Sequence, residues 1–343
     1  MKKEWLGVVL SVSVAVSALA ACTSKTQETS SAQPAASGPA DTAAAGTAAG
    51  TAANEDLSDK EVVFIIKNLT TPFFLSMKAG AEDAGKDFGI KVTVQAPTST
   101  EEGAGNEEQT QLIEQAIANK AAAVCIAPTD SNGIIPAVKK LIEAGIPVIA
   151  SNTKIAEDGL ADCFVGLENY TQGYYVSKEL CEGLGGKGKM FIIEGTAGAQ
   201  TSIDRVAGAT AAIEEYPDIE IVAQQSASYK RASAMDVVQN LLQTNPDVNA
   251  IYCCNDEMAL GAVEAVDAAG KTGQILIGGA DGNADAVQAI LDGKMFTTAE
   301  ANAHDQAYYS VEAAVKVLKG EAAGEKLIES PIITKDNAEE YKR

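Results

Sequence analysis

The chain of 343 residues has few of the side chains that most often carry enzyme chemistry. It contains a single histidine, His304, and its six cysteines form neither a CxxC pair nor a Cys/His pattern typical of zinc. Its first strand-like segment is followed by "NLTTPFFLSMKAG" (68–80), where a dinucleotide-binding chain would carry a GxGxxG loop. The sequence predicts no metal site and no cofactor.

Basic residues are also scarce. Lys and Arg number 26 against 47 Asp and Glu, which gives a net charge of −21. An acidic field of this size does not attract nucleic acid phosphates or anionic membrane surfaces. No apolar run after the first 21 residues is long enough to cross a membrane. We therefore expect no nucleic acid partner and no second membrane anchor.

The N-terminal residues have the pattern of an export signal. Lys2 and Lys3 precede an uncharged, mostly apolar run over residues 6–19, which is too short to span a bilayer. The run leads into "LAAC", which resembles the lipobox of bacterial lipoproteins, where the signal is cut before a cysteine that becomes lipidated. We expect removal of residues 1–21 and lipidation of Cys22. An ordinary signal peptide with a coincidental cysteine is the alternative.

Residues 22–59 are predicted to form a flexible tether behind the lipidated cysteine. They are mostly Ser, Ala, Thr, Gln and Gly, with too few large apolar side chains to build a core. Loss of residues 1–21 removes two lysines and one glutamate, so the mature net charge is about −22. The remaining ~285 residues suffice for two domains. The expected location is extracytoplasmic, anchored by lipid to a bacterial membrane, at the cell surface or in the periplasm.

From residue 60 onward, short β-branched runs alternate with stretches of helical spacing. "EVVFIIK" (61–67) and "AAVCIAP" (122–128) are examples of the former, and "NEEQTQLIEQAIAN" (106–119) of the latter. Nearly continuous apolar strands that alternate with helices are typical of parallel sheets covered on both faces. Ten such runs predict an α/β fold with two sheets of about five strands.

The predicted strands end in polar residues. In open α/β sheets the ligand binds beyond the carboxyl ends of the strands. Some of these residues begin the next helix as N-caps, a role that we assign first to Asp130 and Asp256. Amides beside acids also suit hydroxyl groups, which both donate and accept. The ends carry Lys67, Asn68, Thr129, Asp130, Ser151, Asn152, Glu168, Asn169, Glu194, Asn255, Asp256, Asp281, Asn283 and Asn302.

Two pairs of neighbouring side chains allow more than one interpretation. Phe73 and Phe74 follow the helix-starting Pro72, where they could stack on a sugar ring or simply pack in the core. Cys253 and Cys254 fall in a buried strand whose alternate side chains point to opposite faces, which disfavours joint metal binding. Adjacent cysteines also bridge only with strain. We interpret the cysteines as packing residues.

Several segments resemble the periplasmic sugar-binding proteins of ABC importers, above all the ribose- and allose-binding type. They are "TTPFFLSMKAGAEDAG", "NDEMALGAVEAV", "DVVQNLLQTNPDVNAIY", "VLKG" and "GxDG" (279–282), within residues 60–337. The resemblance implies the type I periplasmic binding protein fold, with two doubly wound α/β domains joined by three hinge crossovers near residues 167, 302 and 330. It places the first domain at 60–166 plus 303–329 and the second at 167–302 plus 330–343.

The resemblance also implies roles for individual residues. Phe73 and Phe74 match an aromatic pair that stacks on the sugar, and Tyr229 matches the aromatic that faces them from the other domain. Arg205 matches an arginine that donates to sugar oxygens, and Lys67 matches a lysine of the allose-binding type. The other implied ligand-binding residues are Asn152, Asn255, Asp281 and Asn302.

Two positions depart from the ribose-binding pattern. Asn152 and Thr153 stand where that type has an aspartate followed by an arginine. Ala280 stands where an aromatic residue often precedes the site aspartate. The pocket is therefore expected to be less charged and roomier. A hexose, a ketose or a polyol suits it at least as well as a pentose.

The sequence thus predicts a monomeric, lipid-anchored solute-binding protein that hands a sugar to an ABC permease and is not an enzyme. A sugar sensor that docks on a membrane receptor is the alternative within the class of binding proteins. A secreted sugar-active hydrolase is the enzyme alternative. It needs paired carboxylates on either side of a glycosidic bond, and the amide-rich strand ends do not favour it.

Overall fold

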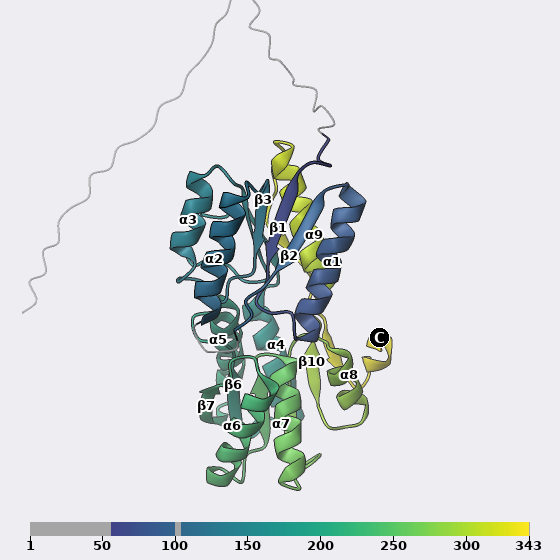
Figure 1. Ribbon diagram of the computed structural model, residues 1–343. Coiled ribbons are helices and arrows are strands. Elements are labelled where there is room, and N and C mark those ends of the chain that lie inside the picture. Colours follow the sequence, from purple (N-terminus) through teal and green to yellow (C-terminus); the bar gives the residue numbers. More distant parts are fainter. Residues whose placement is uncertain (1–55, 100–103, 343) are drawn as a thin grey trace, which may run out of the picture. The chain divides into compact units, whose positions relative to one another are not determined.

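Two sheets organise the part of the chain that the structure describes. The computed structural model describes residues 56–99 and 104–342, so the predicted signal, Cys22 and most of the predicted tether lie outside it. Figure 1 shows helices packed around both sheets. The α/β fold with two sheets is confirmed, with six strands in each sheet instead of five. Within the described ranges, no helix is both long and apolar enough to span a bilayer.

The first sheet has the strand order β11-β5-β4-β3-β1-β2 and is parallel throughout. Side chains alternate between its faces: Val62 and Phe64 pack with α1 and α9, whereas Val63 and Ile65 pack with α2 and α3. The strands are β1 (Glu61–Ile65), β2 (Lys91–Gln95), β3 (Ala123–Ile126), β4 (Val148–Ser151), β5 (Cys163–Gly166) and β11 (Lys326–Leu327). The helices are α1 (Pro72–Phe88), α2 (Ala104–Ala118), α3 (Ile135–Glu143) and α9 (Ala303–Leu318).

The second sheet has the order β12-β10-β9-β8-β6-β7. Its edge strand β12 runs antiparallel to β10, a departure from a purely parallel sheet that edge strands of α/β folds tolerate. The strands are β6 (Lys187–Glu194), β7 (Asp218–Ser226), β8 (Ala250–Cys253), β9 (Leu276–Gly278), β10 (Thr297–Ala299) and β12 (Ile332–Thr334). The helices are α4 (Asn169–Gly183), α5 (Gln200–Glu214), α6 (Arg231–Thr244), α7 (Asp256–Ala268), α8 (Ala284–Leu291) and the 3-10 helix Ala338–Tyr341.

The chain passes from one sheet to the other three times. The passages follow β5, follow β10 and join β11 to β12, near residues 167, 302 and 330. Hydrogen bonds tie two of them to α4. The Gln172 amide donates to Ser330 Oγ over 2.8 Å, and Ser330 Oγ donates to the Glu300 carbonyl over 2.6 Å. The last two passages therefore lie side by side against the start of α4.

Helices α4 and α5 approach each other through glycine. A Cβ on Gly173 would lie 2.0 Å from the Arg205 carbonyl oxygen, and one on Gly208 would lie 1.9 Å from that of Tyr170. No other residue fits at either position without moving a backbone. The contact brings Arg205 on α5 next to Asn169 at the start of α4, which matters for the site described below.

Cys253 is the last residue of β8, and Cys254 follows it. Both side chains are fully buried in the core of the second sheet, and both thiols are free. Burial raises the pKa of Cys254 to about 11 and that of Cys253 well above its ordinary value. Protonated, buried thiols behave as small hydrophobic groups. The interpretation of the pair as packing residues is consistent with this environment.

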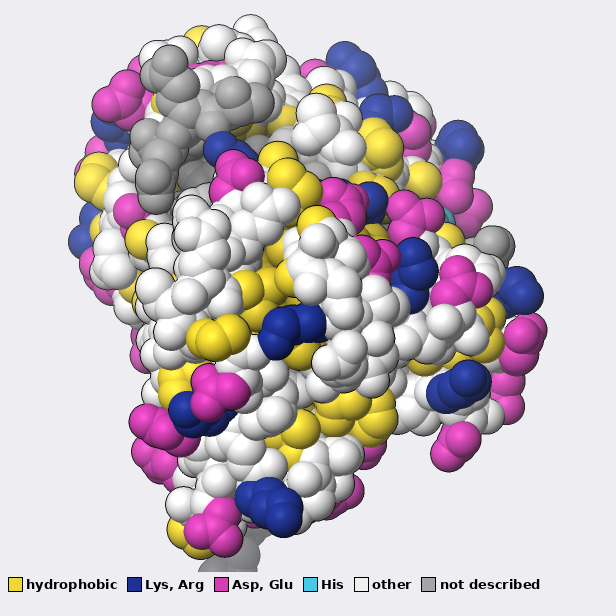
Figure 2. Space-filling model, turned by 90° about the horizontal axis from the view of Figure 1, so that it is seen from below, with side chains coloured by type: hydrophobic (Ala, Val, Ile, Leu, Met, Phe, Trp, Pro, Cys, Tyr) yellow, Lys and Arg dark blue, Asp and Glu magenta, His cyan; other side chains and the backbone are white. Residues whose placement is uncertain are grey.

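The acidic excess is not gathered into a single patch on the face shown in Figure 2. Acidic and basic side chains are interspersed there, with apolar side chains between them. Several ion pairs of this kind join neighbouring elements, such as Lys294 with Asp267 at 3.1 Å and Lys189 with Asp247 at 2.6 Å. Exposed pairs contribute little to stability individually, so the fold depends on its three hydrophobic clusters, two on the faces of the first sheet and one around the second.

Candidate ligand-binding site

The predicted site residues lie at the strand ends of both sheets. In the first sheet, Lys67 follows β1 and Asn152 follows β4. In the second, Asp281 follows β9, Arg205 lies on α5, and Tyr229 lies between β7 and α6. Parallel strands present all their carboxyl ends at one edge, and this is where such sheets place ligands. The question is which of these side chains face one another.

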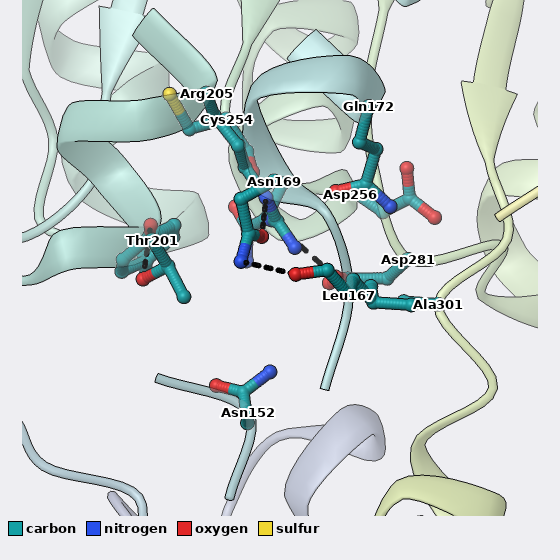
Figure 3. A network of polar contacts seen from close by, with 12 residues as sticks. Asn152, Leu167, Asn169, Gln172, Thr201, Arg205, Cys254, Asp256, Asp281 and Ala301 are labelled. Carbon is teal, nitrogen blue, oxygen red and sulfur yellow. Dashed lines mark hydrogen bonds and ion pairs between the residues drawn. The ribbon is translucent and has the colours of Figure 1, made fainter. Parts of the chain in front are cut away.

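Arg205 is the centre of the polar network shown in Figure 3. Its side chain is only 4% exposed, and its Nη1 lies 3.9 Å from Asp281 Oδ1. Its Nε donates to Asn169 Oδ1 over 2.9 Å, and Nη1 donates to the Cys254 carbonyl over 2.5 Å. Asn169 is held in turn by its own donation to the Leu167 carbonyl over 3.3 Å. The guanidinium therefore joins α4, the end of β8 and the loop after β9.

Tyr229 is fixed by its backbone, its hydroxyl and its ring. Ser228 and Tyr229 have φ values of 53° and 59°, in the left-handed region that non-glycine residues seldom occupy. The phenol oxygen lies 3.2 Å from Thr201 Oγ1. The ring packs on Gly195, where a Cβ would lie 2.1 Å from the ring carbon Cζ. Lys67 of the first sheet places its Nζ 5.8 Å from the ring centroid, within the range of a cation–π contact.

The two sheets also meet through backbone hydrogen bonds. The Ser131 amide, after β3, donates to the Gly198 carbonyl over 3.0 Å. The Gln200 amide at the start of α5 donates to Ser131 Oγ over 3.1 Å. Ser131 is itself fully buried. With Lys67 and Tyr229, these bonds make a contact between loops that belong to different sheets.

Burial and like charges shift the ionisation of the cluster. Burial lowers the pKa of Lys67, the nearby charge of Arg205 adds to the shift and Asp281 opposes it, and the resulting pKa is about 7. Burial raises the pKa of Asp281 well above its ordinary value, an effect that Arg205 opposes and that Asp256 and Glu257 reinforce. Two basic groups and one acid thus lie close together, with Lys67 half-buried and the side chains of Arg205 and Asp281 almost fully buried.

Three predicted amides are occupied by partners within the protein. Asn152 donates from Nδ2 to Gln306 Oε1 over 3.2 Å and accepts from Thr153 Oγ1 over 3.0 Å, and Figure 3 shows it across from the Arg205 network. Asn302 caps α9, because its Oδ1 accepts from the Asp305 amide over 3.2 Å. Asn255 caps α7 in the same way, through the Met258 amide. The amide side chains therefore also support local structure.

Both assigned N-caps are wrong. Asn255 is the cap of α7, since its Oδ1 accepts from the Met258 amide over 3.0 Å, and Asp256 is the first helical residue. The fully buried Asp256 side chain points away from its own helix, toward the loop after β9. Asp130 Oδ1 accepts amides of the turn that precedes α3, whose cap position is Ile134. An extra turn before the helix explains the second error.

Phe73 and Phe74 lie in the first turn of α1. Their ring centroids are 5.1 Å apart in an edge-to-face arrangement, and both rings pack against the hydrophobic cluster that the first sheet forms with α1 and α9. Each is half-buried. The recorded partners of Tyr229 are instead Lys67, Thr201 and Gly195. The structure thus brings together Lys67, Tyr229, Arg205 and Asp281. The two phenylalanines remain half-buried, with one side packed and the other exposed.

Two members of the cluster were not among the predicted site residues. Asn169 is the partner of Arg205 Nε, and Thr201 is the partner of the Tyr229 hydroxyl. Asn169 was visible in the sequence as a strand-end amide, so a signal existed for it. Thr201 lies on α5 one turn before Arg205, and its sequence context carries no comparable signal.

The fold and this arrangement of side chains define a solute-binding protein. A family profile described as "Periplasmic binding protein domain" matches residues 62–322, and the chain belongs to that family. The D-allose-binding periplasmic protein of Escherichia coli (strain K12) is 34% identical over 288 residues, covering 80% of this chain and 92% of the relative. The ribose import binding protein of Bacillus subtilis (strain 168) is 33% identical over 267 residues, covering 78% and 84%.

A solved structure supports the same assignment. The periplasmic solute-binding protein of an ABC transporter from Actinobacillus succinogenes 130z, with bound D-allose, superposes with a TM-score of 0.75. It is 33% identical in sequence, and the match covers 82% of this chain and all of that one. The resemblance to the ribose- and allose-binding type is confirmed. These relatives are substrate-binding proteins of transporters and not enzymes.

Loss of the Arg205 guanidinium should be costly. In Arg205→Met, the Asp281 carboxylate loses its buried counter-ion, and Asn169 Oδ1 and the Cys254 carbonyl lose a donor. We expect the free energy of unfolding in urea to fall by about 3–5 kcal/mol. Arg231→Met is the matched control, because Arg231 is 34% exposed and pairs with Glu257 over 3.1 Å. It should lose about 1 kcal/mol or less. Equal losses would contradict the special position of Arg205.

Lys67 should make stability depend on pH in the alkaline range. With a folded pKa of about 7 and an ordinary value of 10.5, the unfolded chain binds more protons between these limits. Wild-type stability should therefore rise with pH relative to Lys67→Met, by up to ~1.4 kcal/mol per pH unit for one proton. The variant should gain most over wild type below pH 7, and its advantage should shrink as the pH rises toward 10. Urea titrations from pH 6 to 10 test this, and parallel curves would show that Lys67 is not desolvated.

Proposed function

We propose that this protein is the extracytoplasmic sugar-binding component of an ABC importer. It takes a monosaccharide or polyol between the strand ends of its two sheets and delivers it to the permease. The observation that carries the proposal is the meeting of Arg205 and Asp281 of the second sheet with Lys67 of the first, in a chain of the periplasmic binding protein family. The names of the allose and ribose relatives support a sugar as the ligand.

The side chains match the chemistry of a sugar. A carbohydrate has hydroxyl groups at its rim and C–H groups on its faces, so it needs donors, acceptors and an aromatic surface. Arg205 supplies a donor, Asp281 an acceptor and Tyr229 a ring face. The Oδ1 of Asn255 accepts the hydrogen bond of the helix cap, so its Nδ2 is the group that donates to the ligand. Lys67 adds a donor from the opposite sheet.

The remaining predicted residues have smaller proposed roles. Phe73 and Phe74 lie in the first turn of α1, after the end of β1. One side of the pair packs against the core, and the other side offers a ring edge to the ligand. Asn152 donates to Gln306, and Asn302 caps the start of α9. By fixing these neighbours, the two amides define the border of the site. With an amide at Asn152 and a small side chain at Ala280, the site suits a hexose, a ketose or a polyol.

Capture and release are proposed to occur by domain closure. The moving parts are residues 60–166 with 303–329 and residues 167–302 with 330–343, joined by the three passages between the sheets. The bonds of Ser131 to Gly198 and Gln200 support this view, because they link the two parts without a covalent connection nearby. A ligand that contacts both parts favours the closed form by its extra contacts there. The closed form is the one that docks on the permease.

Removal of Asp281 tests the site. The Asp281→Ala variant loses a buried acceptor, which typically costs a few kcal/mol or on the order of a hundredfold in affinity. Tyr229→Ala should weaken binding less, because it removes a ring face and leaves the charged pair. A thermal-shift screen of monosaccharides and polyols selects the ligand, and titration calorimetry measures each variant.

Asp285→Ala is the control for that experiment. Asp285 follows the same loop, but its side chain is 72% exposed and pairs only loosely with Arg231 at 3.5 Å. Its substitution should leave affinity unchanged. If Asp281→Ala folds and binds the selected sugar like wild type, the ligand does not lie at these strand ends.

The N-terminus is proposed to anchor the protein to the membrane. The lipobox-like "LAAC" ends at Cys22, and the polar segment behind it separates the anchor from the folded part. A single lipidated terminus would keep the receptor near its permease while the tether lets it turn. This arrangement suits an extracytoplasmic receptor at the cell surface or in the periplasm.

Substitution of Cys22 tests the anchor. Since its thiol is the acceptor of the lipid, Cys22→Ser should give protein that is either released or retained as uncleaved precursor. Partition into Triton X-114 and mass spectrometry of the mature N-terminus report the two outcomes. A Cys22→Ser protein that partitions with detergent like wild type and is still cut before residue 22 would overturn the assignment. Cys163→Ser, at a buried cysteine far along the chain, serves as the control.

A further inference from the structure

Asp256 is a buried carboxylate that the proposed site does not use. Its side chain is fully buried at the start of α7, yet burial of an isolated carboxylate is costly. Two donors offset that cost. Thr298 Oγ1 donates to Asp256 Oδ1 over 2.5 Å, and the Asn283 amide donates to Oδ2 over 2.8 Å. One donor comes from β10, and the other lies at the end of the loop that carries Asp281.

The backbone of Asp256 contacts the same loop from the other end. Its amide donates to the Ala280 carbonyl over 2.7 Å. Its carboxylate also packs against Gly279, where a Cβ would lie 2.3 Å from Asp256 Oδ1. Asp256 therefore contacts the segment 279–283 before and after Asp281. A side chain at Gly279 would displace the carboxylate, so the contact needs glycine.

The held segment has a backbone that local preferences do not favour. Asp281 has a φ of 141°, a value that persists in a non-glycine residue only when the surroundings determine it, whereas the φ of 68° at Gly282 is ordinary for glycine. The Asp281 amide donates to the Ala299 carbonyl over 2.8 Å, and its own carbonyl accepts from Ala301 over 3.0 Å. These bonds fix the Asp281 backbone to β10, and the Asp256 carboxylate fixes the segment that follows.

We propose that Asp256 is a positioning residue for ligand recognition, which holds the loop 280–283 so that the Asp281 carboxylate meets Arg205 and the ligand. This inference rests on the proposed function, since it concerns the same site. The arrangement has an electrostatic cost: the charge of Asp256 raises the pKa of Asp281, and burial raises the pKa of Asp256 itself to about 6. Asp256 and Asp281 thus lie close together although their negative charges repel each other.

The neutral variant Asp256→Asn keeps the size and hydrogen-bonding capacity of the side chain, whereas Asp256→Ala removes both. Its amide oxygen can accept the Asn283 amide, and its NH2 group can face Thr298 if the hydroxyl turns to accept. Asp256→Ala leaves both donors unpaired. If Asp256 acts through hydrogen bonds to the loop, Asp256→Asn should recover most of the affinity that Asp256→Ala loses. A purely structural side chain of α7 would show no such recovery.

A double-mutant cycle with Asp281→Asn tests the route of action. In the wild-type background, Asp256→Ala should weaken the selected sugar by about tenfold or more in calorimetry. In the Asp281→Asn background, the same change should matter by less than about twofold, because the group that it positions is already altered. Val266→Ala, a buried truncation near the opposite end of the same helix from Asp256, is the stability control and should leave affinity unchanged.

The outcomes separate this inference from the proposed function. If Asp281→Asn weakens the sugar but Asp256→Ala does not, or if the two losses are fully additive, the positioning role is wrong and the site stands. If the screen finds no sugar, the site is wrong, and hydrogen exchange of the amides of Gly282 and Asn283 decides the positioning role alone. Faster exchange there in Asp256→Ala but not in Val266→Ala supports it, and unchanged exchange overturns it.

Discussion

The buried guanidinium of Arg205 is the constraint on which the rest of the site depends. A charge that is 4% exposed must be compensated nearby, and here Asp281, Asn169 and the Cys254 carbonyl compensate it. These partners come from three separate elements, so their positions are fixed relative to one another whenever the guanidinium is in place. The glycine contact between α4 and α5 makes this possible, since any larger residue at Gly173 would push the Arg205 backbone away.

The two sheets contribute unequally to this arrangement. The second sheet holds a satisfied network around Arg205, whereas the first contributes Lys67, whose pKa is lowered by burial and by Arg205. Bringing the sheets together therefore removes water from an ammonium group without giving it a carboxylate of its own. The contact with the Tyr229 ring offsets part of that cost. A ligand hydroxyl that accepts from Lys67 would offset more.

The sequence was sufficient for the architecture, but not for the roles of acids and amides at strand ends. Alternating apolar strands and helices predict two helix-covered sheets, and the family resemblance points to Arg205, Asp281 and Lys67, whose role in ligand binding stays a prediction. The antiparallel β12 was not predicted, because three residues at an edge carry no periodic signal. Asn255 has the capping role that was expected of Asp256, because both residue types can cap a helix. The pairing of Asn152 with Gln306 joins residues 154 positions apart, which no local pattern reveals.

A neutral ligand cannot compensate the buried charges of the site, so groups of the protein must compensate them. A sugar brings no charge, so each ionised group that it covers must already be balanced by the chain. Arg205 and Asp281 balance each other, and Asp256 stays at the edge of the cluster, satisfied by Thr298 and the Asn283 amide. Lys67 needs no counter-ion, because a pKa of about 7 allows its amine to lose the proton and become neutral when water leaves the site. A lysine that can donate in either state serves a hydroxyl ligand without requiring a counter-ion.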